Sequence, residues 1–190
     1  MRTGLPGIVL APLYCWLVLE VGLLVRDLAG RRRSDGDRGT RVLVSVTLIG
    51  AILLGLLLRT LAPALNTPAP HWWAVAGAVT MVLGLALRLW AVVTLGRSFS
   101  TFLGVQPGQT VIRHGPYRWV RHPSYTGLWL VVLGFGVGVG HWLSLTACAG
   151  IPLIGVIPRI RVEEAELTRV LGEEYRAYQR GTYRLVPGIW

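Results

Sequence analysis

Long apolar runs constrain this chain more than any other feature. A membrane-spanning helix needs about 20 consecutive apolar residues. The runs that reach this length are residues 4–25, 42–62, 72–95 and 125–157. The last is long enough for two shorter helices, and His141 and Trp142, which follow a series of glycines, mark the turn of a hairpin. The sequence therefore predicts an all-α integral membrane protein with about five transmembrane helices.

Most of the basic residues lie between the apolar runs. All 19 are arginines, with six in 26–41, four in 96–124 and six after residue 158, whereas 63–71 has none. Because cytoplasmic segments carry the excess of basic residues, the N-terminus is expected outside and the C-terminus inside. This placement explains the net charge of +10 without a nucleic-acid partner. The use of arginine alone suggests a GC-rich bacterial genome, and hence a bacterial cell membrane.

The chain divides into two expected regions. Residues 1–95 form a three-helix membrane region, and residues 96–190 carry the polar clusters and end in a cytoplasmic helix over 159–180. Pro158 suits the start of that last helix. Four scattered histidines and two cysteines without CxxC spacing predict no metal site.

The first polar cluster is GPYRWVRHPSYTG, residues 115–127. Pro116 and Pro123 each push the preceding residue away from helical geometry, so His122 is expected in a non-helical position just before a membrane helix. Ser124 then falls in the first turn, where free N–H groups favour an anion. The aromatic residues of this segment offer flat surfaces for a ring or a ribose: Tyr117, Trp119 and Tyr125.

The second polar cluster is RIRVEEAEL, residues 159–167. Arg159 and Glu163 are four residues apart, so on a helix they share a face and can pair. Glu164 points about 100° away from Glu163. Only one of the two glutamates can therefore face the same site as Arg159.

Charged residues inside apolar runs are costly and often functional. Arg59 is close enough to a helix end for its side chain to reach the interface. Glu20 either pairs with Arg88 between helices or meets lipid headgroups at the inner boundary, and both interpretations remain open. The glycines of 134–140 are expected to allow close helix packing, because no phosphate-loop motif follows them.

Together, RHPSYTG, the glycine-rich hairpin and RIRVEEAEL with LGEEYRAYQ behind it resemble the isoprenylcysteine carboxyl methyltransferase family, and more distantly the membrane phospholipid N-methyltransferases. The resemblance runs from Leu95 to the C-terminus. It implies an S-adenosylmethionine-dependent membrane methyltransferase with its site on the cytoplasmic side. The implied partners are membrane lipids and a lipophilic acceptor, either an isoprenoid or prenylcysteine-like carboxylate or a lipid amine.

Residue by residue, the resemblance implies these cofactor contacts: Gln109, Thr110, Val111, Ile112, Tyr117, His122, Pro123, Ser124, Tyr125 and Glu163. Gln109 stands where eukaryotic members often carry a histidine. Arg159 is the implied substrate-binding residue, and Arg159 and Glu163 are the implied catalytic pair. Arg159 would hold a carboxylate acceptor with two hydrogen bonds, whereas an amine would need Glu163 or His122 as a base.

Two other functions compete with methyl transfer. The sterol reductases share a similar RHP-Tyr segment and use NADPH, so a membrane oxidoreductase is one alternative. A non-enzymatic membrane scaffold is the other, and it predicts that His122 and Arg159 matter only for stability.

Overall fold

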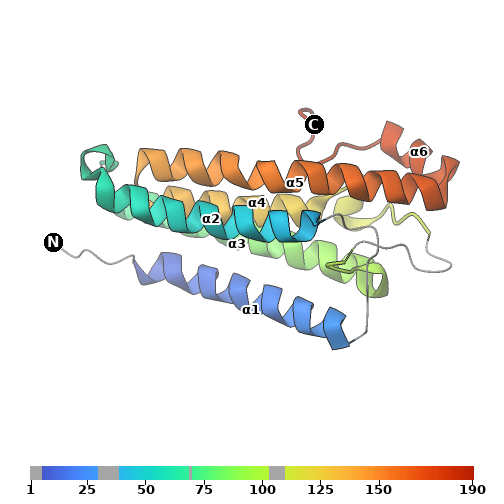
Figure 1. Ribbon diagram of the computed structural model, residues 1–190, viewed down its shortest axis with the longest axis horizontal. Coiled ribbons are helices and arrows are strands. Elements are labelled where there is room, and N and C mark those ends of the chain that lie inside the picture. The colour runs from blue at the N-terminus through green and yellow to red at the C-terminus, as the bar shows by residue number, and fades with distance from the viewer. Residues whose placement is uncertain (1–5, 30–38, 69, 103–109) are drawn as a thin grey trace.

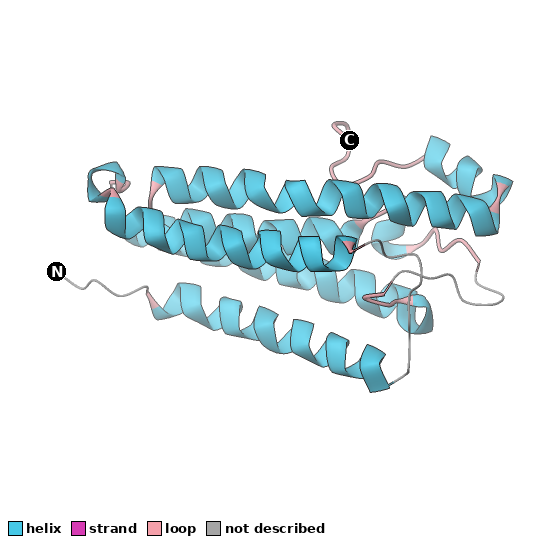
Figure 2. Ribbon diagram, in the orientation of Figure 1, coloured by secondary structure: helices cyan, strands magenta, loops and turns pink. Residues whose placement is uncertain are grey.

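The computed structural model describes residues 6–29, 39–68, 70–102 and 110–190, and within them the chain is helical (Figures 1 and 2). The α-helices of this part are α1 (Gly7–Ala29), α2 (Thr40–Leu61), α3 (Pro70–Leu95), α4 (Pro123–Val139), α5 (Trp142–Leu171) and α6 (Glu173–Arg180). Short 3-10 turns lie at η1 (Pro63–Leu65), η2 (Gly96–Ser98) and η3 (Gly115–Arg118). The described residues form two isolated β-bridges and no β-strand.

Helices α1, α2, α3 and α5 are long and apolar enough to cross a membrane. Their outward faces carry exposed apolar side chains such as Val18, Val46 and Val93, which suit contact with lipid. Helix α4 is apolar but has 17 residues, so the count of five spans stays a prediction. The predicted hairpin is confirmed, because α4 ends at Val139, Gly140 follows with φ 67°, and α5 begins at Trp142.

Glycines bring α3 and α4 into close contact, as the sequence predicted. A Cβ at Gly134 would lie 2.7 Å from the carbonyl oxygen of Gly77, and a Cβ at Gly127 would lie 2.7 Å from that of Gly84. No larger residue fits at such distances without movement of the backbone. The two helices therefore pack backbone to backbone, as small residues allow in membranes.

Helix α5 differs from the expectation for the tail. It continues through Pro152 and Pro158 to Leu171, so the prediction that a separate helix starts at Pro158 was wrong. The chain breaks instead at Gly172, which has φ 57°, and α6 follows. A proline has no backbone N–H and so removes one hydrogen bond of the helix. The residues just beyond Pro158 are buried, with Ile160 at 0% exposure, and this packing keeps the helix continuous.

Helices α2 to α5 lie side by side in one bundle, in which α4 also packs along α5 (Figure 1). Helix α2 packs along α5, and α3 packs along α4. Helix α1 packs on α3 and α4, and Figure 1 shows it set apart from α2. Helix α2 begins, α3 ends and α4 begins at the same end of the bundle (Figure 1). The polar clusters of the sequence lie at this end.

Candidate functional site

A cavity of ≈ 380 Å³ opens at the end of the bundle where the polar clusters meet. It is lined by side chains from all six α-helices and from the segments 98–102 and 110–112. One part is polar, and the other is lined by apolar side chains of α1 and α2, among them Trp16, Leu17, Val21, Leu24, Val44 and Leu48. The cavity is therefore amphipathic, with a size typical of small-molecule sites.

The GPYRWVRHPSYTG segment forms one wall of the cavity. Gly115 has φ 59°, and a Cβ there would lie 2.9 Å from Thr94 Oγ1, so this position suits only glycine. Tyr117 is buried, and its carbonyl accepts a 2.6 Å hydrogen bond from the Tyr178 hydroxyl. Burial raises the pKa of Tyr117 above its ordinary value, and the negative charge of Glu163 adds to the rise. Its hydroxyl therefore stays neutral in the cavity wall.

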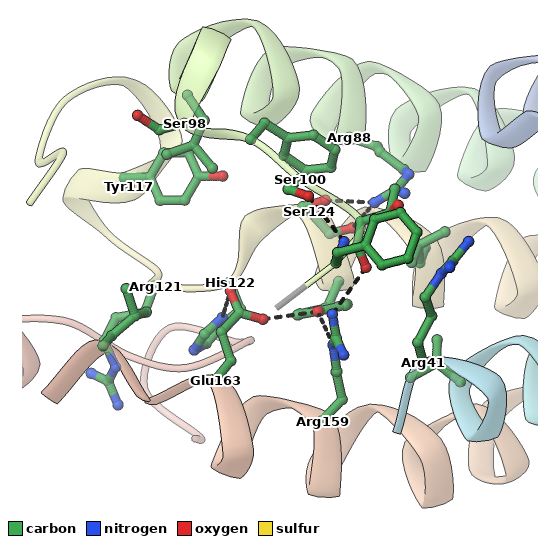
Figure 3. A pocket seen from close by; sticks show the side chains of 18 of the residues that line it. Arg41, Arg88, Ser98, Ser100, Tyr117, Arg121, His122, Ser124, Arg159 and Glu163 are labelled. Carbon is green, nitrogen blue, oxygen red and sulfur yellow. Dashed lines mark hydrogen bonds and ion pairs between the residues drawn. The ribbon is translucent and has the colours of Figure 1, made fainter. Parts of the chain in front are cut away.

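Tyr125, in the first turns of α4, joins the two charged groups that the sequence singled out. Its hydroxyl donates to Glu163 Oε2 at 2.8 Å and accepts from Arg159 Nε at 3.0 Å. The predicted pairing of Arg159 with Glu163 thus runs through a tyrosine hydroxyl. Figure 3 shows Arg159 and Glu163 pointing from α5 into the cavity, with Arg88 and Ser124 across from them.

Arg159 is 3% exposed and connects three parts of the chain. Besides Tyr125, its Nη1 donates to Thr40 Oγ1 at 3.2 Å, and its Nη2 donates to the Thr101 carbonyl at 3.0 Å. These contacts tie α5 to the start of α2 and to the segment 98–102. They fix the plane of the guanidinium at the boundary between the polar and the apolar part of the cavity.

His122 lies between the two consecutive glutamates of α5. Its Nδ1 is 3.9 Å from Glu163 Oε1, and its Nε2 is 3.4 Å from Glu164 Oε1. It precedes Pro123 with φ −124° and ψ 53°, which is the non-helical geometry that the sequence predicted. Glu163 lines the cavity, and the structure places Glu164 behind His122, buried at 5% exposure.

Glu164 is the centre of a buried ionic cluster that the sequence did not reveal. It accepts from Arg121 Nε at 2.8 Å and from Arg184 Nε at 2.9 Å. Arg121 also donates to the carbonyls of Gln179 and Thr182. The residues are far apart in the chain, and the one sequence signal was the geometric argument that Glu163 and Glu164 face different ways.

Backbone hydrogen bonds connect the C-terminal tail to the RHP turn, residues 121–123. The backbone N–H of Arg121 donates to the Tyr183 carbonyl at 2.7 Å, and that of His122 donates to the Arg184 carbonyl at 3.0 Å. The N–H of Tyr183 returns a bond to the Trp119 carbonyl at 3.1 Å. The turn that carries His122 is therefore held by backbone bonds as well as by side chains.

Glu20 and Arg88 pair with each other, which resolves the choice that the sequence left open. Arg88 Nη2 donates to Glu20 Oε2 at 2.7 Å, and Arg88 also donates to the hydroxyl of Ser124 in the first turn of α4. Both charged residues line the cavity. This pair brings α1, α3 and α4 together beside the site.

Most of the residues selected from the sequence meet in this one cavity. They are Thr110, Val111, Ile112, Tyr117, His122, Ser124, Tyr125, Arg159 and Glu163. Pro123 is fully buried beneath them and begins α4. Gln109 lies outside the described residues. Sequence reasoning missed the contributions of α1 and α2, because apolar residues at helical spacing carry no sign of what they face.

The chain is similar to known proteins over most of its length. The model of the isoprenylcysteine carboxyl methyltransferase (ICMT) family matches residues 76–169. A probable protein-S-isoprenylcysteine O-methyltransferase of Oryza sativa subsp. indica is 30% identical over 164 residues, which cover 84% of each chain. Protein-S-isoprenylcysteine O-methyltransferase A of Arabidopsis thaliana is 31% identical over 122 residues, covering 63% of this chain and 62% of the plant protein.

A solved structure shares the fold. The structure of the eukaryotic intramembrane Ras methyltransferase ICMT without a monobody superposes with a TM-score of 0.65 and 26% sequence identity. The match covers 76% of this chain and 52% of the solved one, so this chain corresponds to about half of that protein. The agreement supports the all-helical membrane architecture.

Proposed function

The chain belongs to the isoprenylcysteine carboxyl methyltransferase family, and from that membership we propose that it transfers a methyl group from S-adenosylmethionine to a lipophilic carboxylate. The observation that carries the proposal is the Tyr125 hydroxyl, which links Arg159 to Glu163 in the wall of an amphipathic cavity. The sequence left three functions open: methyl transfer, a reductase activity and a scaffold role. The relatives are named as methyltransferases, which favours the first.

The polar part of the cavity fits the proposed cofactor. Tyr117, Tyr175 and Tyr178 offer aromatic surfaces for a ring. Burial raises the pKa of Tyr178 to about 12, so its hydroxyl stays protonated and keeps its bond to the Tyr117 carbonyl. Glu163 provides a carboxylate for a cationic group. When bound, S-adenosylmethionine supplies a methyl group on a positively charged sulfur. The proposed contacts to it are Thr110, Val111, Ile112, Tyr117, His122, Ser124, Tyr125 and Glu163, with Pro123 supporting them and Gln109 nearby in sequence.

Arg159 and Tyr125 set the position of the acceptor. A carboxylate is already ionised at neutral pH, so methylation of its oxygen requires alignment and the exclusion of water more than a base. The guanidinium of Arg159 binds and orients such a group. Because the Tyr125 hydroxyl lies between Arg159 and Glu163, it keeps the positive and negative groups at a fixed separation. Glu163 then faces the cationic donor, and Arg159 faces the anionic acceptor.

The apolar part of the cavity suits the apolar chain of a lipophilic acceptor. Its walls come from α1 and α2, and a shallow groove on the outer face of α2 shares Arg41, Ser45 and Ile49 with it. An apolar chain can therefore reach the cavity sideways from the membrane. On the positive-inside rule the polar end opens to the cytoplasm and the N-terminus lies outside, in a bacterial cell membrane.

Binding and transfer assays test this function. Purified protein in detergent is expected to bind tritiated S-adenosylmethionine and to transfer the label to an isoprenylated carboxylic acid. His122→Ala and Glu163→Ala should each weaken binding, whereas Arg161→Ala, an exposed arginine on the same helix, should not. Absence of binding, or binding that neither cavity variant changes, would contradict the proposal.

A further inference from the structure

Asp27 is a buried carboxylate to which the methyl transfer described above gives no role. It lies in the last turn of α1 and is 0% exposed. An acidic side chain is disfavoured there, because the C-terminal end of a helix carries a partial negative charge and because burial of a carboxylate is costly. A residue that stands against both preferences needs strong partners, and those partners show what it holds in place.

The two oxygens of the Asp27 carboxylate bind different parts of the chain. Oδ1 accepts from Arg26 Nε at 3.1 Å and from Arg26 Nη2 at 2.8 Å. Oδ2 accepts from the backbone N–H of Thr101 at 2.6 Å, across 74 residues of sequence. Arg26 Nη2 also donates to the Phe99 carbonyl at 3.0 Å. The last turn of α1 therefore binds the main chain of the segment 98–102 at both Phe99 and Thr101.

Thr101 connects Asp27 to Arg159. Its N–H donates to Asp27, and its carbonyl accepts from Arg159 Nη2 at 3.0 Å. Thr101 lies outside the helices, so no helical hydrogen bonds fix its main chain. Its hydroxyl is buried and has no hydrogen-bond partner among the described residues. The bond to Asp27 therefore fixes the main chain that presents the carbonyl to Arg159.

The Thr101 carbonyl differs from the hydroxyls of Tyr125 and Thr40, which also accept from Arg159. Those two residues belong to α4 and α2, which pack along other helices of the bundle. Thr101 belongs to a segment without such packing, and it depends on side chains from other elements for its place. A binding residue is held accurately only when the groups around it are themselves held. The orientation of the Arg159 guanidinium therefore depends on Asp27.

Building on the function proposed above, we propose that Asp27 is a positioning residue for methyl transfer, which holds the guanidinium of Arg159 toward the acceptor carboxylate through the main chain of Thr101. Asp27 itself touches neither the donor nor the acceptor. Its loss leaves the Thr101 N–H without this bond and lets the carbonyl move. The effect falls on the acceptor, because the proposed cofactor contacts lie on other segments, 110–125 and Glu163.

A double-mutant cycle with Arg159 tests this role in the full-length protein. Transfer of a labelled methyl group to N-acetyl-S-farnesylcysteine gives the acceptor KM. Asp27→Ala should raise this KM about tenfold, since a displaced positioning group can cost up to a hundredfold. The Kd of S-adenosylmethionine should change little. In the Arg159→Ala background, Asp27→Ala should not raise KM further, because its effect acts through the guanidinium.

Asp27→Asn is the conservative variant. The asparagine keeps one oxygen that can accept from the Thr101 N–H, so the acceptor KM should lie between those of the wild type and Asp27→Ala. If Asp27→Ala does not fold, Asp27→Asn takes its place in the cycle.

Ser144→Ala is the matched control for stability. Ser144 is 0% exposed in the first turn of α5, and its hydroxyl donates to the Gly55 carbonyl of α2 at 2.6 Å. It is not among the described residues that line the cavity. Like Asp27→Ala, this variant removes a buried side-chain bond between distant parts of the chain, but it should leave the acceptor KM unchanged.

The guanidinium of Arg159 can also be followed without an acceptor. Its Nε–H signal in nitrogen-15 NMR spectra of the protein in detergent is assigned by its loss in Arg159→Lys. Asp27→Ala should shift or broaden this signal, whereas Ser144→Ala should leave it in place.

An acceptor KM that Asp27→Ala leaves unchanged, or raises equally in the Arg159→Ala background, overturns the role of Asp27 and leaves methyl transfer standing. An unchanged Nε–H signal in Asp27→Ala overturns it as well. If S-adenosylmethionine does not bind and no methyl group is transferred, the proposed function fails and the role of Asp27 in methyl transfer fails with it.

Discussion

Glu163 and Glu164 are consecutive residues of α5 with opposite environments. The Glu163 side chain is 30% exposed and faces the cavity, where it accepts from Tyr125. The Glu164 side chain is 6% exposed and lies among Arg121, Arg184 and His122. The two carboxylates should therefore have separate roles, one in chemistry and one in stability.

Glu164→Gln should destabilise the protein by about 3 kcal/mol, because it leaves the buried Arg121 with a neutral partner and weakens the contact with Arg184. Thermal unfolding in detergent measures the loss. Glu163→Gln is the matched comparison, and it should reduce methyl transfer strongly while the unfolding temperature stays close to that of the wild type. Similar unfolding temperatures for the two variants would contradict the division of roles.

Tyr125→Phe should lower kcat at least tenfold, with a loss of stability that leaves the protein folded. The variant keeps the ring and removes only the hydroxyl that joins Arg159 to Glu163, and hydrogen bonds to charged groups contribute about 1.5–3 kcal/mol. Single-turnover transfer of a labelled methyl group measures the effect. Tyr183→Phe serves as the control, since Tyr183 supports the RHP turn through its backbone N–H and carbonyl. An unchanged rate for Tyr125→Phe would remove the bridge from the mechanism.

Arg159→Lys should raise the acceptor KM as much as Arg159→Ala does. Three different nitrogens of Arg159 donate to three different groups, and an ammonium cannot reproduce that planar geometry. Steady-state kinetics with varied acceptor concentration measures KM. Arg161→Lys, on the exposed side of α5, should behave like the wild type. Recovery of normal KM by lysine would show that charge alone is sufficient.

Gly77→Ala should destabilise the bundle by about 1–3 kcal/mol, since the new Cβ would lie 2.3 Å from the backbone nitrogen of Gly138. Gly50→Ala on α2 is the control, because nothing lies within 4 Å of a Cβ there. Unfolding in detergent compares the two. Equal stability of the variants would mean that α3 and α4 can move apart at little cost.

Hydropathy and spacing predicted the membrane helices well, because burial in lipid depends on local composition. They failed at Pro158, since the local preference of proline was outweighed by buried neighbours such as Ile160, whose packing depends on the folded bundle. The site shows the same limit. Arg159 and Glu163 share one helix turn, so their common face was predictable from the sequence.

The partners of those residues were not predictable, because they come from distant parts of the chain. Arg121 meets Glu164 across 43 residues, and Arg88 meets Glu20 across 68. Such pairs depend on how α1, α3 and α5 are placed against one another. Local rules say which way a side chain points on its own helix, and only the packing says what it meets.

The backbone bonds between the C-terminal tail and the RHP turn bear on how this protein can be engineered. The family match ends at residue 169, yet the carbonyls that satisfy the amides of Arg121 and His122 belong to Tyr183 and Arg184. A fragment trimmed to the shared region would lose the backbone bonds that hold the turn carrying His122. Purification tags and fusion partners should therefore be attached at the N-terminus, where α1 begins far from that turn in Figure 1.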